Sequence, residues 1–421
     1  MTERPKIEWL SPLPPCRSGI ADYTNDVAEA LSAVADVRYW NFFGDDGRGL
    51  PPRFLVTDWN KVEGRRALEC AGIPIYHFGN NPRFHRPMWH LIRRWPGVAV
   101  IHDQVLLGLA ADAFARRSTP GQFTRTMQRY YGAEGIAASR DILQGTADLI
   151  ELGPRFPFTP YVLKRATATV VHTRALRDFV AARFDMPLLY APLPYRGGGS
   201  SSHRGGFRNP LQIVVFGHLG PNRRLPSILA AISESPYRDR LHLTVAGEIA
   251  GRAEIAGRIE RLQLDGHVTI LGFVTEQRLA QLLAGSDVAI NLRFPTMGEA
   301  SHSQLHLWAA GLPTLATNTG WYAEQPETTL VRIEPAREIE GIKEFIALAF
   351  EQPQLLLEVG RKGREWVERV HSPMLYAENL VEFLGSIAGP PWRRARPRSM
   401  LGRIRSLFGS RRRRDQAHPP G

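Results

Sequence analysis

Short apolar runs alternate with amphipathic segments along most of the chain. In the first half, runs rich in β-branched and aromatic residues occupy 6–11, 35–43, 73–79, 97–103 and 167–173. Segments between them, such as 23–35 and 174–184, have the spacing of amphipathic helices, and Thr173 is placed to cap the second one. Because apolar strands alternating with helices are typical of βαβ units, the pattern predicts a doubly wound parallel sheet.

The same alternation restarts after a break. Residues 196–206 read RGGGSSSHRGG, a Gly/Ser run without periodicity that cannot bury enough apolar surface to order itself. Strand-like runs then recur at 211–217, 241–247, 267–273, 286–294 and 312–318. We therefore predict an α/β protein with two Rossmann-like parallel-sheet domains, at 1–195 and 208–371, joined by a flexible link at 196–207.

Two amphipathic helices are expected near the end of the chain, at 354–370 and 372–387. Pro373 separates them, because proline disfavours the helical conformation of the residue before it. We assign 372–390 to a helix that packs back toward the first domain and 391–421 to a basic tail. Two facing parallel sheets bind ligands beyond the carboxyl ends of their strands, so functional motifs are expected in those loops.

Composition agrees with two globular domains and locates the charge. The 421 residues, 43% of them hydrophobic, suit two domains of about 150–200 residues each. Of the net charge of +12, ten arginines and one aspartate beyond Pro391 supply +9, so the body carries only about +3. The basic balance therefore does not indicate a specific nucleic-acid-binding fold. With two cysteines and neither a secretory signal nor a bilayer-spanning run, we expect a cytoplasmic protein.

The tail has a second pattern besides its charge. Apolar residues recur between the arginines at helical spacing, at Met400, Leu401, Ile404, Leu407 and Phe408. An apolar face flanked by cations suits an anionic membrane surface, here the inner face of the plasma membrane. A solvated tail, or one that contacts RNA nonspecifically, is the open alternative.

One candidate phosphate site lies in the second half. In VVFGHLGPNRRLP, a strand is followed by a loop with Gly217 and then by Arg223 and Arg224 before a helix. Free backbone N–H groups, the helix dipole and two guanidiniums together attract phosphate. An ordinary strand-to-helix turn with solvated arginines is the alternative, since the spacing matches neither a dinucleotide fingerprint nor a P-loop.

A carboxylate follows a second loop of the same kind. In RFPTMGEASHSQLHLWAAGLP, at 293–313, Glu299 directly follows Gly298 before a helix start. Such an acid can simply stabilise the helix dipole. If a diphosphate lies over this helix start, however, Glu299 is better explained as an acceptor for sugar hydroxyls or as a charge that stabilises a cationic anomeric carbon.

The run from 293 to 327 resembles the donor-site segment of glycosyltransferase family 4, whose members are retaining nucleotide-sugar enzymes of the GT-B fold. The segment SPLPPCRSGIADYTNDVAEAL at 11–31 resembles the amino-terminal acceptor-side loop of bacterial members. Further segments that match in order and spacing are 76–85, 97–106, 214–224 and 271–293. The resemblance spans about residues 6–388.

This resemblance implies roles for single residues. Glu299 and His102 stand at the positions that act on the donor sugar in the family. On the acceptor side stand Gly19 and Asp22, although Asp22 could instead cap a helix, and His102 and Asp103 could instead form a buried pair. The residues that the resemblance assigns to the donor site are Gly217, Arg223, Arg224, Phe273, Val274, Gly298, Ser301 and Ser303, with Phe273 and Val274 at the base.

The chain departs from the family at one position. A second glutamate usually reads the ribose, but the two ways of counting reach Leu307 or His306. Ribose recognition then falls to His306, Glu324 or the backbone, and the sequence does not choose among them. The chain has no Asp-x-Asp metal motif, and the GDD at 44–46 lies in a Gly-rich loop. We expect neither a cofactor nor a metal.

Together these features predict a metal-independent, retaining glycosyltransferase. Its donor would be a nucleoside diphosphate sugar and its acceptor a hydroxyl of a glycan or of a lipid-linked acceptor. Two alternatives stay open: a nucleotide-sugar epimerase or hydrolase on the same scaffold, and a catalytically silent binding or scaffold protein.

Overall fold

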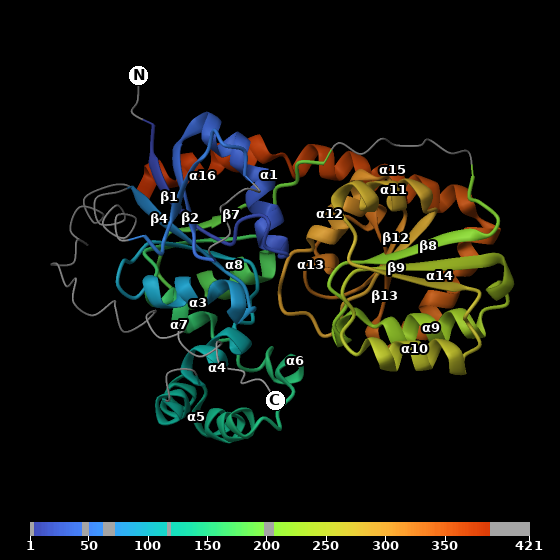
Figure 1. Ribbon diagram of the computed structural model, residues 1–421, viewed down its shortest axis with the longest axis horizontal. Helices are drawn as coiled ribbons and strands as arrows, with labels where there is room; N and C mark the ends of the chain where they lie inside the picture. The colour runs from blue at the N-terminus through green and yellow to red at the C-terminus, as the bar shows by residue number, and fades with distance from the viewer. Residues whose placement is uncertain (1–3, 44–49, 62–71, 116–118, 198–205, 388–421) are drawn as a thin grey trace, which may run out of the picture.

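The structure is a computed structural model that describes residues 4–43, 50–61, 72–115, 119–197 and 206–387. It consists of two parallel β-sheets side by side, each covered by helices on both faces (Figure 1). The predicted α/β class with two parallel-sheet domains is therefore confirmed. Most of the predicted link at 196–207, the tail at 391–421 and the GDD sequence lie outside the described residues.

The first sheet has seven strands in the order β3-β2-β1-β4-β5-β6-β7, and neighbouring strands pair in parallel. Its strands are β1 (Lys6–Leu10), β2 (Asp36–Asn41), β3 (Leu55–Asp58), β4 (Ile73–Phe78), β5 (Val98–Ile101), β6 (Ala168–Val171) and β7 (Leu188–Tyr190). All four residues of β5 and of β6 are buried, as expected for parallel strands covered on both faces.

The helices of the first domain are α1 (Gly19–Val34), α3 (Pro82–Leu91), α4 (Leu107–Ala115), α5 (Pro120–Gln144), α6 (Leu149–Leu152), α7 (Thr159–Leu163) and α8 (Arg174–Ala181). Ser18 caps α1, Asn81 caps α3, and Thr173 caps α8 as predicted. Because Ser18 is the N-cap, the suggestion that Asp22 caps this helix is wrong. Between β5 and β6 the chain makes a long helical excursion, α4 to α7, which extends below the sheet in Figure 1.

The second sheet has six parallel strands in the order β10-β9-β8-β11-β12-β13. They are β8 (Leu211–Phe216), β9 (Leu241–Ala246), β10 (Val268–Gly272), β11 (Val288–Asn291), β12 (Thr314–Thr317) and β13 (Val331–Ile333). The helices are α9 (Leu225–Glu234), α10 (Arg252–Arg261), α11 (Glu276–Gly285), α12 (His302–Ala309), α13 (Gly320–Ala323), α14 (Glu338–Glu351) and α15 (Pro353–Val370). Short 3₁₀ turns are η1 (Pro221–Arg223), η2 (Arg238–Arg240), η3 (Glu327–Thr329) and η4 (Pro335–Arg337).

The last described helix, α16 (Pro373–Ile387), returns to the first domain and lies beside α1 (Figure 1). The hydroxyl of Tyr23 on α1 donates a hydrogen bond to that of Tyr376 at 2.5 Å. The apolar core around Trp9 and Tyr23 continues through α16 to Trp308 of the second domain. The chain therefore crosses between the domains twice, and a shared core stabilises the crossing.

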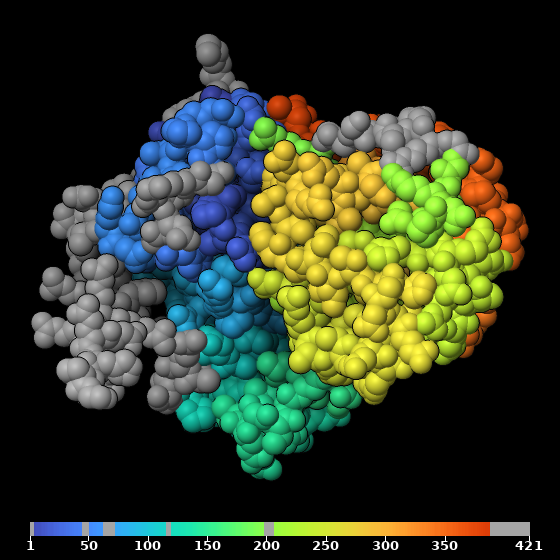
Figure 2. All heavy atoms as spheres, turned by 45° about the vertical axis from the view of Figure 1, so that its right-hand side comes forward, coloured from blue at the N-terminus to red at the C-terminus, as the bar shows by residue number. Residues whose placement is uncertain are grey.

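The two domains touch along one seam. Figure 2 shows yellow atoms of the second domain against blue and teal atoms of the first. The backbone N–H of Val105 donates to the carbonyl of Met297 at 3.0 Å, and His302 on α12 contacts Asp26 on α1 at 2.9 Å. None of the helices in the described part of the chain combines the length and apolar composition that crossing a bilayer requires.

Candidate active site

Both sheets reverse their strand order at this seam. The reversal lies between β1 and β4 in the first sheet and between β8 and β11 in the second. Open parallel sheets bind ligands beyond the carboxyl ends of the strands at such points. The loops after β8 and β11 carry Arg223 and Glu299, and those after β1 and β4 carry Gly19 and Asn80.

Glu299 lies inside a tight loop and does not cap α12. Its carboxylate accepts a hydrogen bond from the backbone N–H of Met297 at 2.8 Å and one from the Thr296 hydroxyl at 3.3 Å. It also forms an ion pair with Arg293, and both side chains are nearly buried, at 13% and 14% exposed. Ser301 is the N-cap of α12, since its hydroxyl accepts from the N–H of Gln304 at 3.2 Å. The explanation of Glu299 as a simple helix-start acid is therefore wrong.

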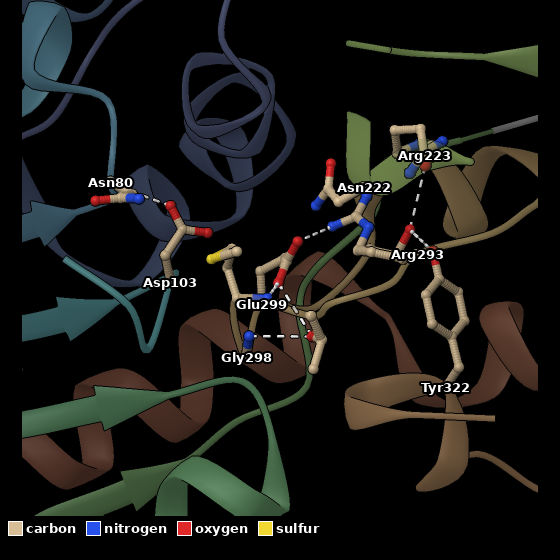
Figure 3. Close-up of polar contacts among 12 residues, drawn as sticks. Asn80, Asp103, Asn222, Arg223, Arg293, Gly298, Glu299 and Tyr322 are labelled. Carbon is tan, nitrogen blue, oxygen red and sulfur yellow. Dashed lines mark hydrogen bonds and ion pairs between the residues drawn. The ribbon is translucent and has the colours of Figure 1, made fainter. Parts of the chain in front are cut away.

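Arg223 and Arg293 form a buried cationic pair beside this carboxylate (Figure 3). Arg223 is only 4% exposed and donates to the carbonyl of Phe216 at 3.0 Å. Burial, and then the Arg293 charge, lowers the pKa of Arg223 to about 10. Burial alone would also lower the pKa of Arg293, but the Glu299 charge raises it above its ordinary value.

These two guanidiniums have unused hydrogen-bonding capacity. The Nε–H groups of Arg223 and Arg293 are buried and have no hydrogen-bond partner within the described residues. The two guanidiniums lie beside the Glu299 carboxylate, and the Asp103 carboxylate of the first domain also acts on Arg293. Buried donors without partners are costly, and a bound anion would satisfy them.

Arg224 is not part of this pair. It has a left-handed backbone, with φ of 58°, and its Nε–H lies 2.9 and 3.0 Å from the two carboxylate oxygens of Glu338 at the start of α14. The turn at Pro221–Arg223 therefore directs the side chain of Arg224 to Glu338 and that of Arg223 to the carbonyl of Phe216. The cation beside Arg223 is Arg293, which the sequence analysis did not identify, and the donor-phosphate role of Arg224 stays a prediction.

Two of the predicted glycines allow close backbone packing. Gly217 has φ of 118°, and a Cβ atom on the neighbouring Gly247 would lie 1.8 Å from the Gly217 carbonyl oxygen. Gly298 has φ of 75°, and a Cβ there would lie 2.4 Å from Cβ of Gln104 in the first domain. Only glycine fits these positions, and they bring the loops of β8, β9 and β11 to the seam.

The two predicted serines belong to one hydrogen-bonded cluster at the start of α12. The Ser301 hydroxyl lies 3.1 Å from that of Ser303 and accepts from the Tyr322 hydroxyl at 2.8 Å. Ser303 in turn donates to the side-chain oxygen of Asn291 at 3.4 Å. These contacts fix the helix start next to Glu299.

Phe273 lines a pocket at the ends of β9 and β10. The pocket has a volume of about 240 Å³, and its wall consists of Gly247, Glu248, Ile249, Arg252, Gly272 and Phe273. The Phe273 ring is 52% exposed, whereas Val274 packs into the apolar cluster around Phe216. Arg17 of the first domain lies 4.0 Å from the Phe273 ring centroid and 3.6 Å from Glu248. Of the two residues predicted at the base, only Phe273 faces the pocket.

The two side chains considered for ribose recognition already have partners at the seam. Nδ1 of His306 lies 3.0 Å from the hydroxyl of Tyr195, and burial, followed by the His302 charge, lowers the pKa of His306 to about 3. Each carboxylate oxygen of Glu324 accepts from a backbone N–H at the start of α8, those of Arg174 and Ala175, at 2.7 Å. Glu324 therefore caps a helix of the other domain, and its role as a ribose ligand stays a prediction.

On the first domain, His102 is buried in a neutral cluster. Its Nε2 lies 3.0 Å from Nδ1 of His77, and its ring centroid lies 4.9 Å from that of His172. Burial lowers the pKa of His77 and of His102 well below the ordinary histidine value, with neighbouring imidazoles adding to the effect. Asp103 does not pair with His102. Its Oδ2 accepts from the backbone N–H of Asn80 at 2.6 Å, so the proposed His102–Asp103 pair is wrong.

The acceptor-side residues lie at the start of α1. A Cβ atom on Gly19 would meet nothing within 4 Å, so the chain leaves open space there. Asp22 lies one turn further along. Solvent reaches this residue, but the protein packed around its carboxylate raises the pKa to about 6, while the His302 charge lowers it. Among the described residues, no group of three or more His, Cys, Asp and Glu side chains is arranged to hold a metal ion.

The comparison with known families covers the second domain. Residues 203–366 match the family model described as glycosyl transferases group 1. The second domain is a glycosyl transferases group 1 domain. No curated protein sequence matches the chain.

Solved structures resemble the group 1 domain together with the first domain. Sucrose-phosphate synthase from Thermosynechococcus elongatus has a TM-score of 0.60 and 15% identity, over 92% of this chain and 99% of that one. Anabaena HepE in complex with UDP and glucose has a TM-score of 0.58 and 14% identity, over 91% and 100%. WaaG, a glycosyltransferase involved in lipopolysaccharide biosynthesis, has a TM-score of 0.57 and 16% identity, over 91% and 100%.

These likenesses establish the fold, which is GT-B as predicted. The chain also spans about half the length of some larger matching structures, at TM-scores below 0.5. Arg293 and Asp103 lie near Glu299 but were not among the site residues predicted from the sequence. Arg293 lies just beyond the end of β11 and Asp103 just beyond the end of β5, and this position after a strand was the signal available in the sequence.

Proposed function

We propose that this protein is a retaining, metal-independent glycosyltransferase of family 4. It transfers a sugar from a nucleoside diphosphate to a hydroxyl of a glycan or of a lipid-linked acceptor. The observation that carries the proposal is the pair of buried guanidiniums, Arg223 and Arg293, whose Nε–H groups have no partner within the described residues and lie beside Glu299.

The diphosphate fits the charge of this site. When the bond between the anomeric carbon and the phosphate oxygen breaks, its electron pair leaves with the diphosphate, which gains negative charge. Arg223 and Arg293 are already in place to stabilise that charge, so no reorganisation is needed during the reaction. In this proposal they supply the positive charge that a divalent metal provides in other transferases.

The sugar lies next to Glu299 and His102. Glu299 accepts hydrogen bonds from sugar hydroxyls, and its charge stabilises the cationic anomeric carbon. The acceptor oxygen bonds to that carbon on the face that the phosphate leaves, and the hydroxyl proton passes to the departing phosphate oxygen, so the configuration is retained. Neutral His102 offers a hydrogen bond without adding charge, and Phe273 stacks on the base in the pocket it lines.

A ligand screen tests the nucleotide part of the proposal. UDP, GDP and ADP are each added to the full chain and the melting temperature is measured, with UDP first because HepE structures contain UDP and UDP-glucose. A ligand that binds only the native state at 100 times its Kd stabilises it by about 2.7 kcal/mol. At least one diphosphate should raise the melting temperature, and the absence of any shift would contradict the proposal.

A donor-only assay separates transfer from the two alternatives. Release of nucleoside diphosphate should require an acceptor or proceed slowly with water. Free sugar or an epimer that forms equally fast without acceptor would favour a hydrolase or epimerase. Binding without any turnover, over a panel of acceptors, would favour a silent binding protein.

We also propose that the chain works in the cytoplasm, held at the inner face of the membrane by the tail at 391–421. Its ten arginines would bind anionic lipid reversibly. Removing 391–421 should release the protein from vesicles that contain phosphatidylglycerol while soluble-acceptor transfer persists. Unchanged vesicle binding would refute the anchor.

A further inference from the structure

Asp103 stands at the carboxyl end of β5, on the first-domain side of the seam. Its Oδ2 is fixed by the backbone N–H of Asn80 at 2.6 Å, in the turn that follows β4. Asn80 is itself fixed, because its side-chain oxygen accepts from the N–H groups of Gly108 and Leu109 at 2.8 and 3.3 Å, in the first turn of α4. Two loops and a helix therefore hold this carboxylate in one position.

The seam brings Asp103 opposite Glu299. The next residues, Gln104 and Val105, contact the Glu299 loop directly: Val105 donates to the Met297 carbonyl at 3.0 Å, and Gln104 packs against Gly298. Figure 3 shows Asp103 and Glu299 on facing sides, one from each domain. The two carboxylates are thus set at a separation that the backbone of both domains determines.

One oxygen of Asp103 has no role in holding the fold. Within the part of the chain that the structure describes, the Asn80 N–H is the hydrogen bond made to this carboxylate, at Oδ2, and no ion pair is made to it. Oδ1 is therefore left over. Asp103 is half-buried, so this oxygen can meet a ligand at the seam, and acids in such surroundings are typical of functional sites.

The charges around Asp103 favour a near-neutral titration. Burial raises the pKa of Asp103 to about 7, the Glu299 charge adds to this, and the Asn80 N–H and Arg293 oppose it. The other groups nearby are His102, which precedes it, and His85 on α3. Burial lowers the pKa of both histidines, that of His85 to about 4, so both are neutral at pH 7.

We propose that Asp103 binds the acceptor: its Oδ1 accepts the hydrogen bond of the hydroxyl that attacks the sugar held at Glu299. This inference rests on the proposed function. The hydroxyl oxygen forms the new bond to the anomeric carbon, the phosphate oxygen leaves with the bonding electrons, and the hydroxyl proton passes to that phosphate. Asp103 orients the hydroxyl and keeps no proton at the end of the reaction.

The placement of Asp103 fits an acceptor site better than a donor site. The donor cations and the base pocket belong to the second domain, while Asp103 belongs to the first and faces them across the seam. A carboxylate beside a diphosphate would repel it, whereas a neutral hydroxyl donates to a carboxylate readily. The acceptor is thereby placed on the wall that contains Gly19, where the chain leaves open space.

The test compares Asp103→Asn with Asp148→Asn. Asp148 is also a first-domain aspartate that accepts a backbone N–H, from Ile150 at 2.8 Å, but it caps α6 and is exposed. Donor affinity is measured by calorimetry with UDP-glucose, GDP-mannose and ADP-glucose. Diphosphate release is then followed from pH 5.5 to 8.5, with n-octyl glycosides of glucose, galactose and mannose as acceptors and with water alone.

For Asp103→Asn we expect donor affinity within about twofold of wild type and an acceptor kcat/KM lower by 10- to 100-fold, the range of one charge-assisted hydrogen bond. Wild-type kcat/KM should fall as the pH drops through about 7, where Asp103 gains its proton, and this fall should disappear in the variant. Asp148→Asn should behave as wild type in both respects.

Two results would overturn the inference. One is transfer by Asp103→Asn within threefold of wild type with an unchanged pH profile. The other is a fall in donor affinity and in melting temperature that accompanies the loss of transfer in Asp103→Asn, which would indicate a purely structural role. A wild-type protein that neither binds nor cleaves any of the donors would instead refute the proposed function, so the two failures are distinguishable.

Discussion

The two sheets share one strand order, but the side chains at their carboxyl edges differ in charge. In the second domain, two guanidiniums and a carboxylate, those of Arg223, Arg293 and Glu299, lie together and are nearly buried. In the first domain, the same edge carries His77 and His102, which burial keeps neutral. The second-domain wall is therefore preorganised for an anionic ligand, whereas the first-domain wall provides uncharged hydrogen-bonding groups and one carboxylate.

The largest effect is expected from the second-domain carboxylate. Glu299→Gln preserves the shape and can still accept the Met297 N–H, but it removes the charge that faces the anomeric carbon. Loss of one preorganised electrostatic group reduces kcat by about 10²- to 10³-fold. Steady-state transfer assays should show this drop. The melting temperature should also fall, because Arg293 loses its nearly buried partner, so the assays are run well below it. Glu344→Gln, on the exposed face of α14, is the control. Transfer at the wild-type rate would refute the assignment.

The effect of substituting an arginine on nucleoside diphosphate affinity should depend on its place in the structure and not on its place in the sequence. Arg223→Lys and Arg293→Lys should each weaken nucleoside diphosphate binding by about 10- to 100-fold, since a bidentate charge-assisted contact is lost. Arg224→Lys should leave the affinity unchanged, because Arg224 pairs with Glu338. Titration calorimetry measures all three, and a loss in Arg224→Lys equal to the others would restore the adjacent pair that the sequence suggested.

Acid should weaken the first domain more than the second, because burial lowers the histidine pKa at four first-domain positions, His77, His85, His102 and His172, but at His306 and His371 in the second domain. The pKa values of His85 and His172 are lowered to about 4 by burial, so the unfolded chain binds their protons first as the pH falls below 6.5. Each then removes about 1.4 kcal/mol of stability per pH unit between 6.5 and 4. Hydrogen exchange at pH 7.5 and 5.5 should show the first sheet opening before the second. Equal protection of both sheets at pH 5.5 would contradict this.

The smallest effect is expected at the seam. Glu324 accepts two backbone N–H groups from α8 of the other domain, and an acid at a helix start contributes about 0.3–1 kcal/mol. Glu324→Gln should therefore change diphosphate affinity by less than about fivefold. The exposed Glu327→Gln provides the comparison. A loss of diphosphate affinity as large as that of Arg223→Lys would show that Glu324 contacts the nucleotide.

Much of this architecture could be predicted because it depends on local pattern. Continuous apolar runs in parallel strands are buried on both faces, so their alternation with helices identified both sheets, and Thr173 was recognised as a cap from its position alone. The loop that carries Glu299 was recognised for the same reason, since Gly298 and Glu299 are adjacent in the chain. Features of this kind need no knowledge of side-chain direction.

The sequence did not predict contacts that depend on the direction in which a side chain points. Arg224 follows Arg223 in sequence, but its left-handed backbone turns the side chain toward Glu338. Arg293 becomes the partner of Arg223 only because β8 and β11 are neighbours in the sheet. Glu324 reaches α8 because the domains meet there. None of these proximities is recorded in the spacing of residues.

The most direct test of the central claim is a crystal structure of the chain with the nucleoside diphosphate that stabilises it most. The account predicts phosphate oxygens within hydrogen-bonding distance of the guanidiniums of Arg223 and Arg293, and the base against Phe273. An empty site at saturating ligand, or a nucleotide bound elsewhere with Arg223 and Arg293 untouched, would contradict it.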